Sequence, residues 1–148
     1  MKVYIAGPLF NESERKANIF LRDLLLGWGY ETHLPQEEAG IGFALIKNEL
    51  DREVVREKIF ENDVAGVKNC DIFLCVLDGR VPDEGACVEL GMAYALGKPC
   101  VGYKTDQRTM DKYGENIMVE QCLLGVAKDI LELKNLLDIH ARTPKTLR

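Results

Sequence analysis

Short apolar runs alternate along the chain with longer segments in which apolar residues recur every three or four positions. The first run, 2-KVYIAG-7, contains strand-favouring residues and closes on a Gly-Pro pair, which predicts a strand that ends in a turn. Asn11 or Ser13 can cap the next segment, which has helical spacing and ends at a Gly-Trp-Gly sequence. Its apolar residues are Ala17, Phe20, Leu21, Leu24 and Leu25. A second strand is predicted over 30-YETHLP-35.

The same alternation continues through the rest of the chain. A long helix is predicted from about Ile46 to Lys68, and the run 71-DIFLCVL-77 after it is typical of a central strand covered on both faces. The apolar residues expected on one broad face of the long helix are Leu50, Val54, Ile59, Val64 and Val67. The later predicted elements are a helix over 84–97, a strand over 99–103, a short strand around 117–119 and a helix over about 127–139.

This order of elements predicts the fold class. Strands that alternate with helices form a parallel sheet with right-handed crossovers, so we expect an α/β doubly wound sheet with helices on both faces. No repeat or linker divides the sequence, which indicates one domain over residues 1–148. Ligands of such sheets bind beyond the carboxyl ends of the strands, here the loops 7–10, 78–83 and 104–106.

Composition excludes several classes of function. The chain is 47% hydrophobic and 29% charged, as in ordinary globular domains. Its net charge of −5 argues against a protein that binds nucleic-acid phosphates. No apolar run approaches the roughly 20 residues of a membrane span, and acidic residues directly after the first strand argue against a secretory signal. We therefore expect neither nucleic acid nor membrane as a partner.

Cysteine and histidine usage gives no sign of a metal or cofactor. The five cysteines show no C-x-x-C spacing and lie mostly in apolar segments, which indicates reduced thiols in a cytoplasmic protein. They are Cys70, Cys75, Cys87, Cys100 and Cys122. His33 and His140 alone offer little for a zinc site or a serine–histidine triad. Gly40 and Gly42 lack the third glycine of a dinucleotide fingerprint, and no phosphate-binding loop motif occurs.

The stretch 78-DGRVPDEGACVELGMAYALGKP-99 carries the strongest candidate chemistry. If a helix begins near Asp83, then Gly85 and Glu89 share one stripe with apolar residues, and Gly85 leaves open space one turn above the carboxylate. Glu89 is then either a functional carboxylate or a partly exposed residue paired with a lysine. Asp83 is either a substrate ligand or an ordinary N-cap.

Other candidates are weaker when taken alone. Asp63 stands late in the long helix, where a carboxylate opposes the helix dipole. Tyr4 is typical of a strand core, and Asn116 and Met118 are typical of a turn and a strand. An acidic cleft without a metal cluster or redox pair favours acid–base or glycosyl chemistry over metal-assisted hydrolysis.

The sequence resembles the nucleoside 2-deoxyribosyltransferases and their relatives that hydrolyse nucleotide N-glycosidic bonds. The resemblance is carried by 3-VYIAGPLF-10, 61-ENDVAGVKNCDIFLCVLDG-79, 83-DEGACVELGMAYALGKP-99 and 116-NIM-118. Its most specific part is the D-x-G-x-x-x-E-L-G-x-A block that contains Asp83 and Glu89. The resemblance implies a flavodoxin-like fold, a homo-oligomer and a reaction without metal or cofactor.

The resemblance also implies residue roles. Glu89 corresponds to the nucleophile that attacks the anomeric carbon, Asp63 to the carboxyl group that binds and protonates the base, and Tyr4 to the residue that orients the nucleophile. Asp83 would hold the 5′-hydroxyl together with Asn116, which reaches in from a neighbouring subunit. The expected substrate-binding residues are Asp83, Gly85, Gly7, Pro8, Phe10, Asn116 and Met118.

Three functions follow from this resemblance. The first is transfer of a 2-deoxyribosyl group between nucleobases through a glycosyl-glutamate intermediate with retention, with nucleoside and nucleobase as small-molecule partners. The second is hydrolysis of 2-deoxynucleoside 5′-phosphates or nucleosides, against which Asp83 argues because a carboxylate there would repel a 5′-phosphate. The third is a non-catalytic nucleotide-sensing domain of the same fold.

Overall fold

The computed structural model describes residues 1–37, 46, 47, 49–106, 108 and 114–142. In this part of the chain five parallel strands form one sheet in the order β2-β1-β3-β4-β5. They are β1 (Lys2–Ala6), β2 (Glu31–His33), β3 (Ile72–Val76), β4 (Cys100–Tyr103) and β5 (Val126–Ala127). The predicted doubly wound parallel sheet is confirmed. Its strand order reverses between β1 and β3, and the carboxyl ends of these two strands border the crevice in which such sheets bind ligands.

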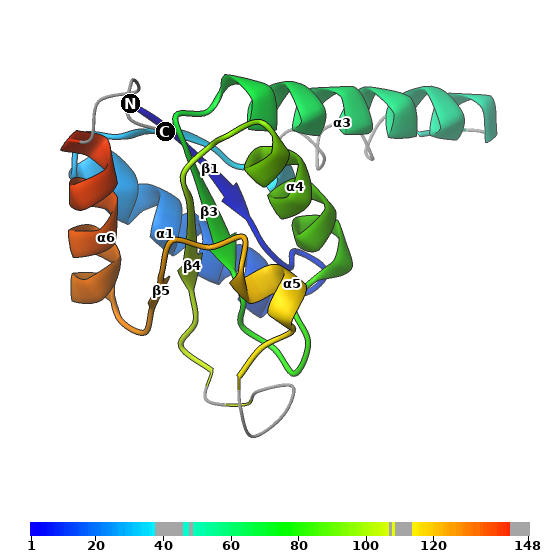
Figure 1. Cartoon of the computed structure of the whole chain (residues 1–148). Coiled ribbons are helices and arrows are strands. Elements are labelled where there is room, and N and C mark those ends of the chain that lie inside the picture. The colour runs from blue at the N-terminus through cyan, green and yellow to red at the C-terminus, as the bar shows by residue number, and fades with distance from the viewer. Residues whose placement is uncertain (38–45, 48, 107, 109–113, 143–148) are drawn as a thin grey trace.

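Helices cover both faces of the sheet, as Figure 1 shows. They are α1 (Glu12–Gly27), α3 (Glu49–Asn69), α4 (Glu84–Ala95), α5 (Ile117–Glu120) and α6 (Ile130–Arg142). Side chains of α1 and α6 pack in one apolar cluster, and side chains of α3, α4 and α5 pack in another on the opposite face. Gly40 and Gly42, considered above as part of a dinucleotide fingerprint, lie outside the described residues.

Alternate strand residues feed these two clusters. Val3 and Ile5 of β1 face α1 and α6, while Tyr4 and Ala6 face α3 and α4. All residues of β3 are buried because helices cover both of its faces. The near-continuous apolar run of the sequence thus marks the centre of the sheet, as predicted.

Helix α3 is buried only near its end. Only Gly66 and Val67, near its end, are buried, whereas Leu50 is 76% exposed and Val54 is 44% exposed. Figure 1 shows the reason, since the first half of α3 extends past the edge of the sheet. The predicted long helix therefore packs against the sheet only near its end, which its apolar spacing did not indicate.

The segment after β4 also differs from its prediction. The short strand expected around 117–119 is wrong, because these residues form the single turn of α5. Asn116 caps that turn, and its side chain accepts a hydrogen bond of 2.9 Å from the Met118 amide. The fifth strand comes later, at the start of the predicted last helix, and its two residues are too few to show a period.

A buried ion pair anchors the chain between β4 and α5. Nζ of Lys104 lies 2.8 Å from Oε1 of Glu115, and the two side chains are 9% and 8% exposed. Apart from Lys104, the Glu115 oxygens have no hydrogen-bond partner in the described part of the chain, so Lys104 is the charge that compensates their burial. The Asp78 carboxylate fixes the same region by accepting hydrogen bonds from the Thr105 amide and hydroxyl.

Replacement of Lys104 by Met is expected to lower the free energy of unfolding by about 3 kcal/mol or more, because Glu115 would then be a buried charge without a partner among the described residues. Urea unfolding measures the loss, and the double variant Lys104→Met, Glu115→Leu should recover most of it. Lys16→Met is the matched control, since the Lys16–Glu12 pair is 73% and 76% exposed and is worth at most about 1 kcal/mol. Equal losses in Lys104→Met and Lys16→Met would contradict the expectation.

Candidate active site

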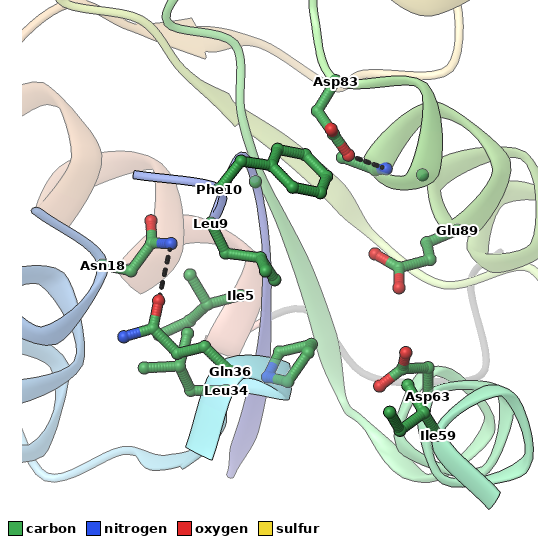
Figure 2. Close-up of a pocket in the computed structure, with 14 residues that line it drawn as sticks. Ile5, Leu9, Phe10, Asn18, Leu34, Gln36, Ile59, Asp63, Asp83 and Glu89 are labelled. Carbon is green, nitrogen blue, oxygen red and sulfur yellow. Dashed lines mark hydrogen bonds between the residues drawn. The ribbon is translucent and has the colours of Figure 1, made fainter. Parts of the chain in front are cut away.

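A cavity of about 230 Å³ opens at the crevice beside the carboxyl end of β1. Three carboxylates line it: Asp63 from α3, Asp83 from the start of α4, and Glu89 from nearly two turns further along α4. Figure 2 shows the carboxylates of Asp63 and Glu89 pointing toward one another across the cavity. The apolar side chains of the lining are Ile5, Leu9, Phe10, Leu34, Pro35, Ile59 and Ala86. The site thus combines an apolar wall with a small group of acids.

Glu89 is held by the first strand. The hydroxyl of Tyr4, whose residue is fully buried, donates a hydrogen bond of 2.8 Å to Oε1 of Glu89. Burial raises the pKa of Glu89 to about 7; the Tyr4 hydrogen bond opposes the rise, and the charges of Asp63 and Asp83 add to it. The lysine pairing considered from the sequence is not found among the described residues, and Glu89 faces the cavity.

Tyr4 remains a hydrogen-bond donor throughout the working pH range. Burial raises the pKa of its hydroxyl far above the ordinary value, and the nearby charges of Glu89 and Asp63 raise it further. A neutral phenol beside Glu89 can donate only through its single O–H group, so it binds Oε1 and leaves Oε2 without this hydrogen bond.

Asp83 takes the cap position considered from the sequence and also lines the cavity. Its Oδ2 accepts a hydrogen bond of 2.8 Å from the Ala86 amide, as Figure 2 shows. Gly85 lines the cavity between Asp83 and Glu89, and a Cβ on it would lie 3.1 Å from the capping oxygen. The absence of a side chain at Gly85 thus leaves room for both the cap and a ligand.

The other expected site residues fall into three groups. Gly7 and Phe10 line the same cavity, and Phe10 is 75% exposed at its mouth. Pro8 lines an adjoining hollow of about 450 Å³, which also includes Phe10 and Asp83. Asn116 and Met118 do not line the cavity of their own chain; both are exposed, on and beside α5.

Asn18 and Gln36 line the cavity and were not predicted. Asn18 is 3% exposed, and its Nδ2 donates hydrogen bonds to the Pro8 carbonyl and to Oε1 of Gln36. These bonds tie α1 to the loops after β1 and β2, and Figure 2 shows the bond to Gln36. A signal existed in the sequence: Asn18 lies three residues before Leu21 and seven before Leu25, on the buried stripe of α1. Phe20, one of the apolar residues at helical spacing in the sequence, is 53% exposed.

The described residues contain no group of three or more His, Cys, Asp or Glu side chains placed to hold a metal ion. Within the same residues, every helix is too short or too polar to cross a membrane.

Comparison with known proteins identifies the family. A sequence model described as nucleoside 2-deoxyribosyltransferase matches residues 3–129 of the chain. The chain belongs to the nucleoside 2-deoxyribosyltransferase family. The matched range includes Tyr4, Asp63, Asp83 and Glu89, so every group around the nucleophile candidate lies within the family domain. No curated protein sequence matches the chain significantly.

Solved structures agree with this family. A 2-deoxyribosyltransferase from Bacillus psychrosaccharolyticus is 26% identical with a TM-score of 0.73, over 97% of this chain and 93% of that one. A 2-deoxyribosyltransferase from Leishmania mexicana is 22% identical with a TM-score of 0.66, over 94% and 98% of the two chains. A CMP N-glycosidase from Clostridium botulinum is 16% identical with a TM-score of 0.57, over 94% and 98%. The last two share the fold.

Replacement of Glu89 by Gln is expected to stabilise this deoxyribosyltransferase-family fold at about pH 8. The pKa of Glu89 rises from an ordinary 4.5 to about 7 on folding, so the folded protein binds the proton more tightly than the unfolded chain. Wild-type stability should therefore fall as pH rises between these values, by up to about 3 kcal/mol. Glu89→Gln should lack this fall, as measured by urea unfolding across the pH range.

The matched control is Glu57→Gln, because Glu57 is an exposed glutamate of α3. It should follow the wild-type pH dependence. If the stability of Glu89→Gln relative to wild type is no greater at about pH 8 than at about pH 4.5, the raised pKa assigned to this carboxyl is contradicted.

Proposed function

We propose that the protein is a nucleoside 2-deoxyribosyltransferase that moves the 2-deoxyribosyl group between nucleobases, with Glu89 as nucleophile. The observation that carries the proposal is the Tyr4–Glu89 hydrogen bond at a cavity that Asp63 and Asp83 share. A carboxylate fixed by one oxygen presents the other in a defined direction, as a nucleophile requires. Membership of the deoxyribosyltransferase family supports the reaction class.

In the first step Oε2 of Glu89 attacks the anomeric carbon while the bond from this carbon to the base nitrogen breaks. The bonding electrons leave with the base, which takes a proton delivered through Asp63. Positive charge that builds on the sugar ring is stabilised by the Glu89 carboxylate before the ester bond forms. A pKa of about 7 leaves a substantial share of Glu89 ionised at neutral pH and also makes it an adequate leaving group.

In the second step an acceptor base enters on the face from which the first base departed. Its nitrogen attacks the anomeric carbon, the ester bond to Glu89 breaks, and Asp63 takes up the proton that the incoming nitrogen loses. Two displacements retain the configuration at this carbon. Water in place of the base gives hydrolysis by the same chemistry, so access of a base decides between transferase and hydrolase.

Asp83 favours free nucleosides over nucleoside 5′-phosphates. We propose that Oδ1 of Asp83 accepts a hydrogen bond from the 5′-hydroxyl of the substrate, while Oδ2 caps α4. A helix N-terminus would otherwise attract a phosphate, but here a carboxylate occupies it. The adjoining hollow beside Pro8 is also acidic, because Glu14, Asp78 and Glu84 line it together with Asp83. An entering phosphate would therefore meet like charges at close range.

We further propose a homo-oligomer in which Asn116 completes a neighbouring site. In support of this, Asn116 does not line its own cavity, and the adjacent Ile117 and Met118 are 69% and 74% exposed. Exposed apolar side chains on a short helix are typical of a surface that another subunit covers. A cytoplasmic location stays a prediction from the reduced cysteines, which are free in the described structure.

Incubation with deoxyinosine and free adenine is expected to yield deoxyadenosine and hypoxanthine, measured by chromatography. Glu89→Ala should lower this exchange at least about a thousandfold because the nucleophile is lost. Glu57→Ala, an exposed position on α3, is the matched control and should exchange normally.

Other products of this assay would contradict the proposal in distinct ways. Hypoxanthine release without deoxyadenosine would indicate a hydrolase. Turnover confined to deoxynucleoside 5′-phosphates would refute the role given to Asp83. Absence of turnover with every deoxynucleoside and deoxynucleotide would favour a non-catalytic sensing domain. A wild-type rate in Glu89→Ala would show that Glu89 is not the nucleophile.

Mixing two inactive variants tests whether Asn116 acts across subunits. Glu89→Ala and Asn116→Ala should each exchange bases poorly alone. After subunit exchange, hybrid dimers contain one site with Glu89 from one chain and Asn116 from the other, so about a quarter of the sites should recover. Activity that does not rise on mixing, although subunits demonstrably exchange, would show that Asn116 does not act across the interface.

A further inference from the structure

Three aromatic rings lie in one row beneath α3. Tyr4 of β1 is the register partner of His33 on β2 and of Phe73 on β3, so all three side chains point to the same face of the sheet. The Tyr4 and His33 rings are 4.9 Å apart at 14°, and the Tyr4 and Phe73 rings are 5.4 Å apart at 11°. The ring of Tyr4 is therefore enclosed on both of its faces.

Gly66 closes the same row from above. A Cβ on this buried residue of α3 would lie 2.6 Å from Nε2 of His33 and 2.7 Å from Cε2 of Tyr4. No side chain fits there without a shift of one of the rings. Helix α3 thus rests its backbone on the edges of His33 and Tyr4, with Asp63 one turn earlier on the helix.

These contacts fix the one polar group that Tyr4 presents to the cavity wall. A ring held on two faces and along one edge cannot tilt, so its hydroxyl stays 2.8 Å from Oε1 of Glu89. We propose that His33 and Gly66 are positioning residues for the nucleophile, which they orient through the Tyr4 hydroxyl. The kinetic consequence rests on the proposed function, whereas the structural one does not.

A double-mutant cycle separates positioning from a general effect on the fold. His33→Leu removes the flat ring and is expected to lower kcat for base exchange about tenfold with little change in KM, as for a misplaced reacting group. In a Tyr4→Phe background, which keeps the ring but lacks the hydroxyl, the same change should cost less than about twofold. Equal losses in both backgrounds would overturn the proposal.

Two further variants keep the test sharp. His33→Phe retains a ring that can stack on Tyr4 and should restore kcat to within about twofold of wild type; a loss equal to that of His33→Leu would overturn the stacking role. Gly66→Ala should lower kcat as His33→Leu does. Gly27→Ala is its matched control, because a Cβ at the end of α1 has nothing within 4 Å.

A titration tests the proposal without any turnover. The Tyr4 hydrogen bond lowers the pKa of Glu89, against the burial and the charges of Asp63 and Asp83 that raise it. NMR of carbon-labelled glutamate carboxyls should therefore show a higher pKa of Glu89 in His33→Leu and Gly66→Ala than the wild-type value of about 7. An unchanged pKa in both folded variants would overturn the proposal even if the protein moves no deoxyribosyl group. A raised pKa without base exchange would overturn only the proposed function.

Discussion

The hydrogen bond from Tyr4 to Glu89 is the constraint on which the site depends. It joins two residues that are 85 positions apart, one in the first strand and one in α4. A buried carboxylate is costly to ionise, and this bond compensates part of that cost while fixing one oxygen in place. The same carboxylate lines the cavity together with Asp63 and Asp83, so the bond sets the position of Glu89 within the site.

Close packing of α4 makes that bond possible. Ala86, Leu90 and Ala93 are its buried residues, and two of them are small enough to bring the helix close to the sheet. Gly97 follows the helix with a φ of 68°, a left-handed conformation that suits glycine and ends the helix before β4. Glu89 therefore sits beside a tightly packed stripe, which keeps its carboxylate at a constant distance from Tyr4.

Long periodic segments were predictable, and short or locally controlled ones were not. The apolar run of β3 and the glycine-bearing helix after it predicted the centre of the fold and placed Asp83 and Glu89 at the cavity. The two residues of β5 and the single turn of α5 are too short to show a period. The structure of β5 is set by its pairing with β4, and that of α5 by the Asn116 cap. Strand β5 is held in the sheet by its pairing with β4, and no local sequence pattern encodes that pairing.

The candidate site was predictable to a similar extent. Spacing alone left Glu89 and Asp83 ambiguous, and Tyr4 had the appearance of an ordinary core residue until its strand partners were known. Asn18 lies on the buried stripe of α1, but its part in the site comes from hydrogen bonds to Pro8 and Gln36, residues that it meets only in the folded chain. The exposed first half of α3 shows a further limit, since apolar spacing indicates a face of a helix but not what covers it.

Mass spectrometry of the protein quenched during turnover tests the central claim most directly. With a deoxynucleoside present and no acceptor base, the account predicts a 2-deoxyribosyl group attached to the peptide that contains Glu89, and no such adduct in Glu89→Gln. An adduct on Asp63 or Asp83, or steady turnover in which Glu89 never carries the sugar at any quench time, would contradict the account.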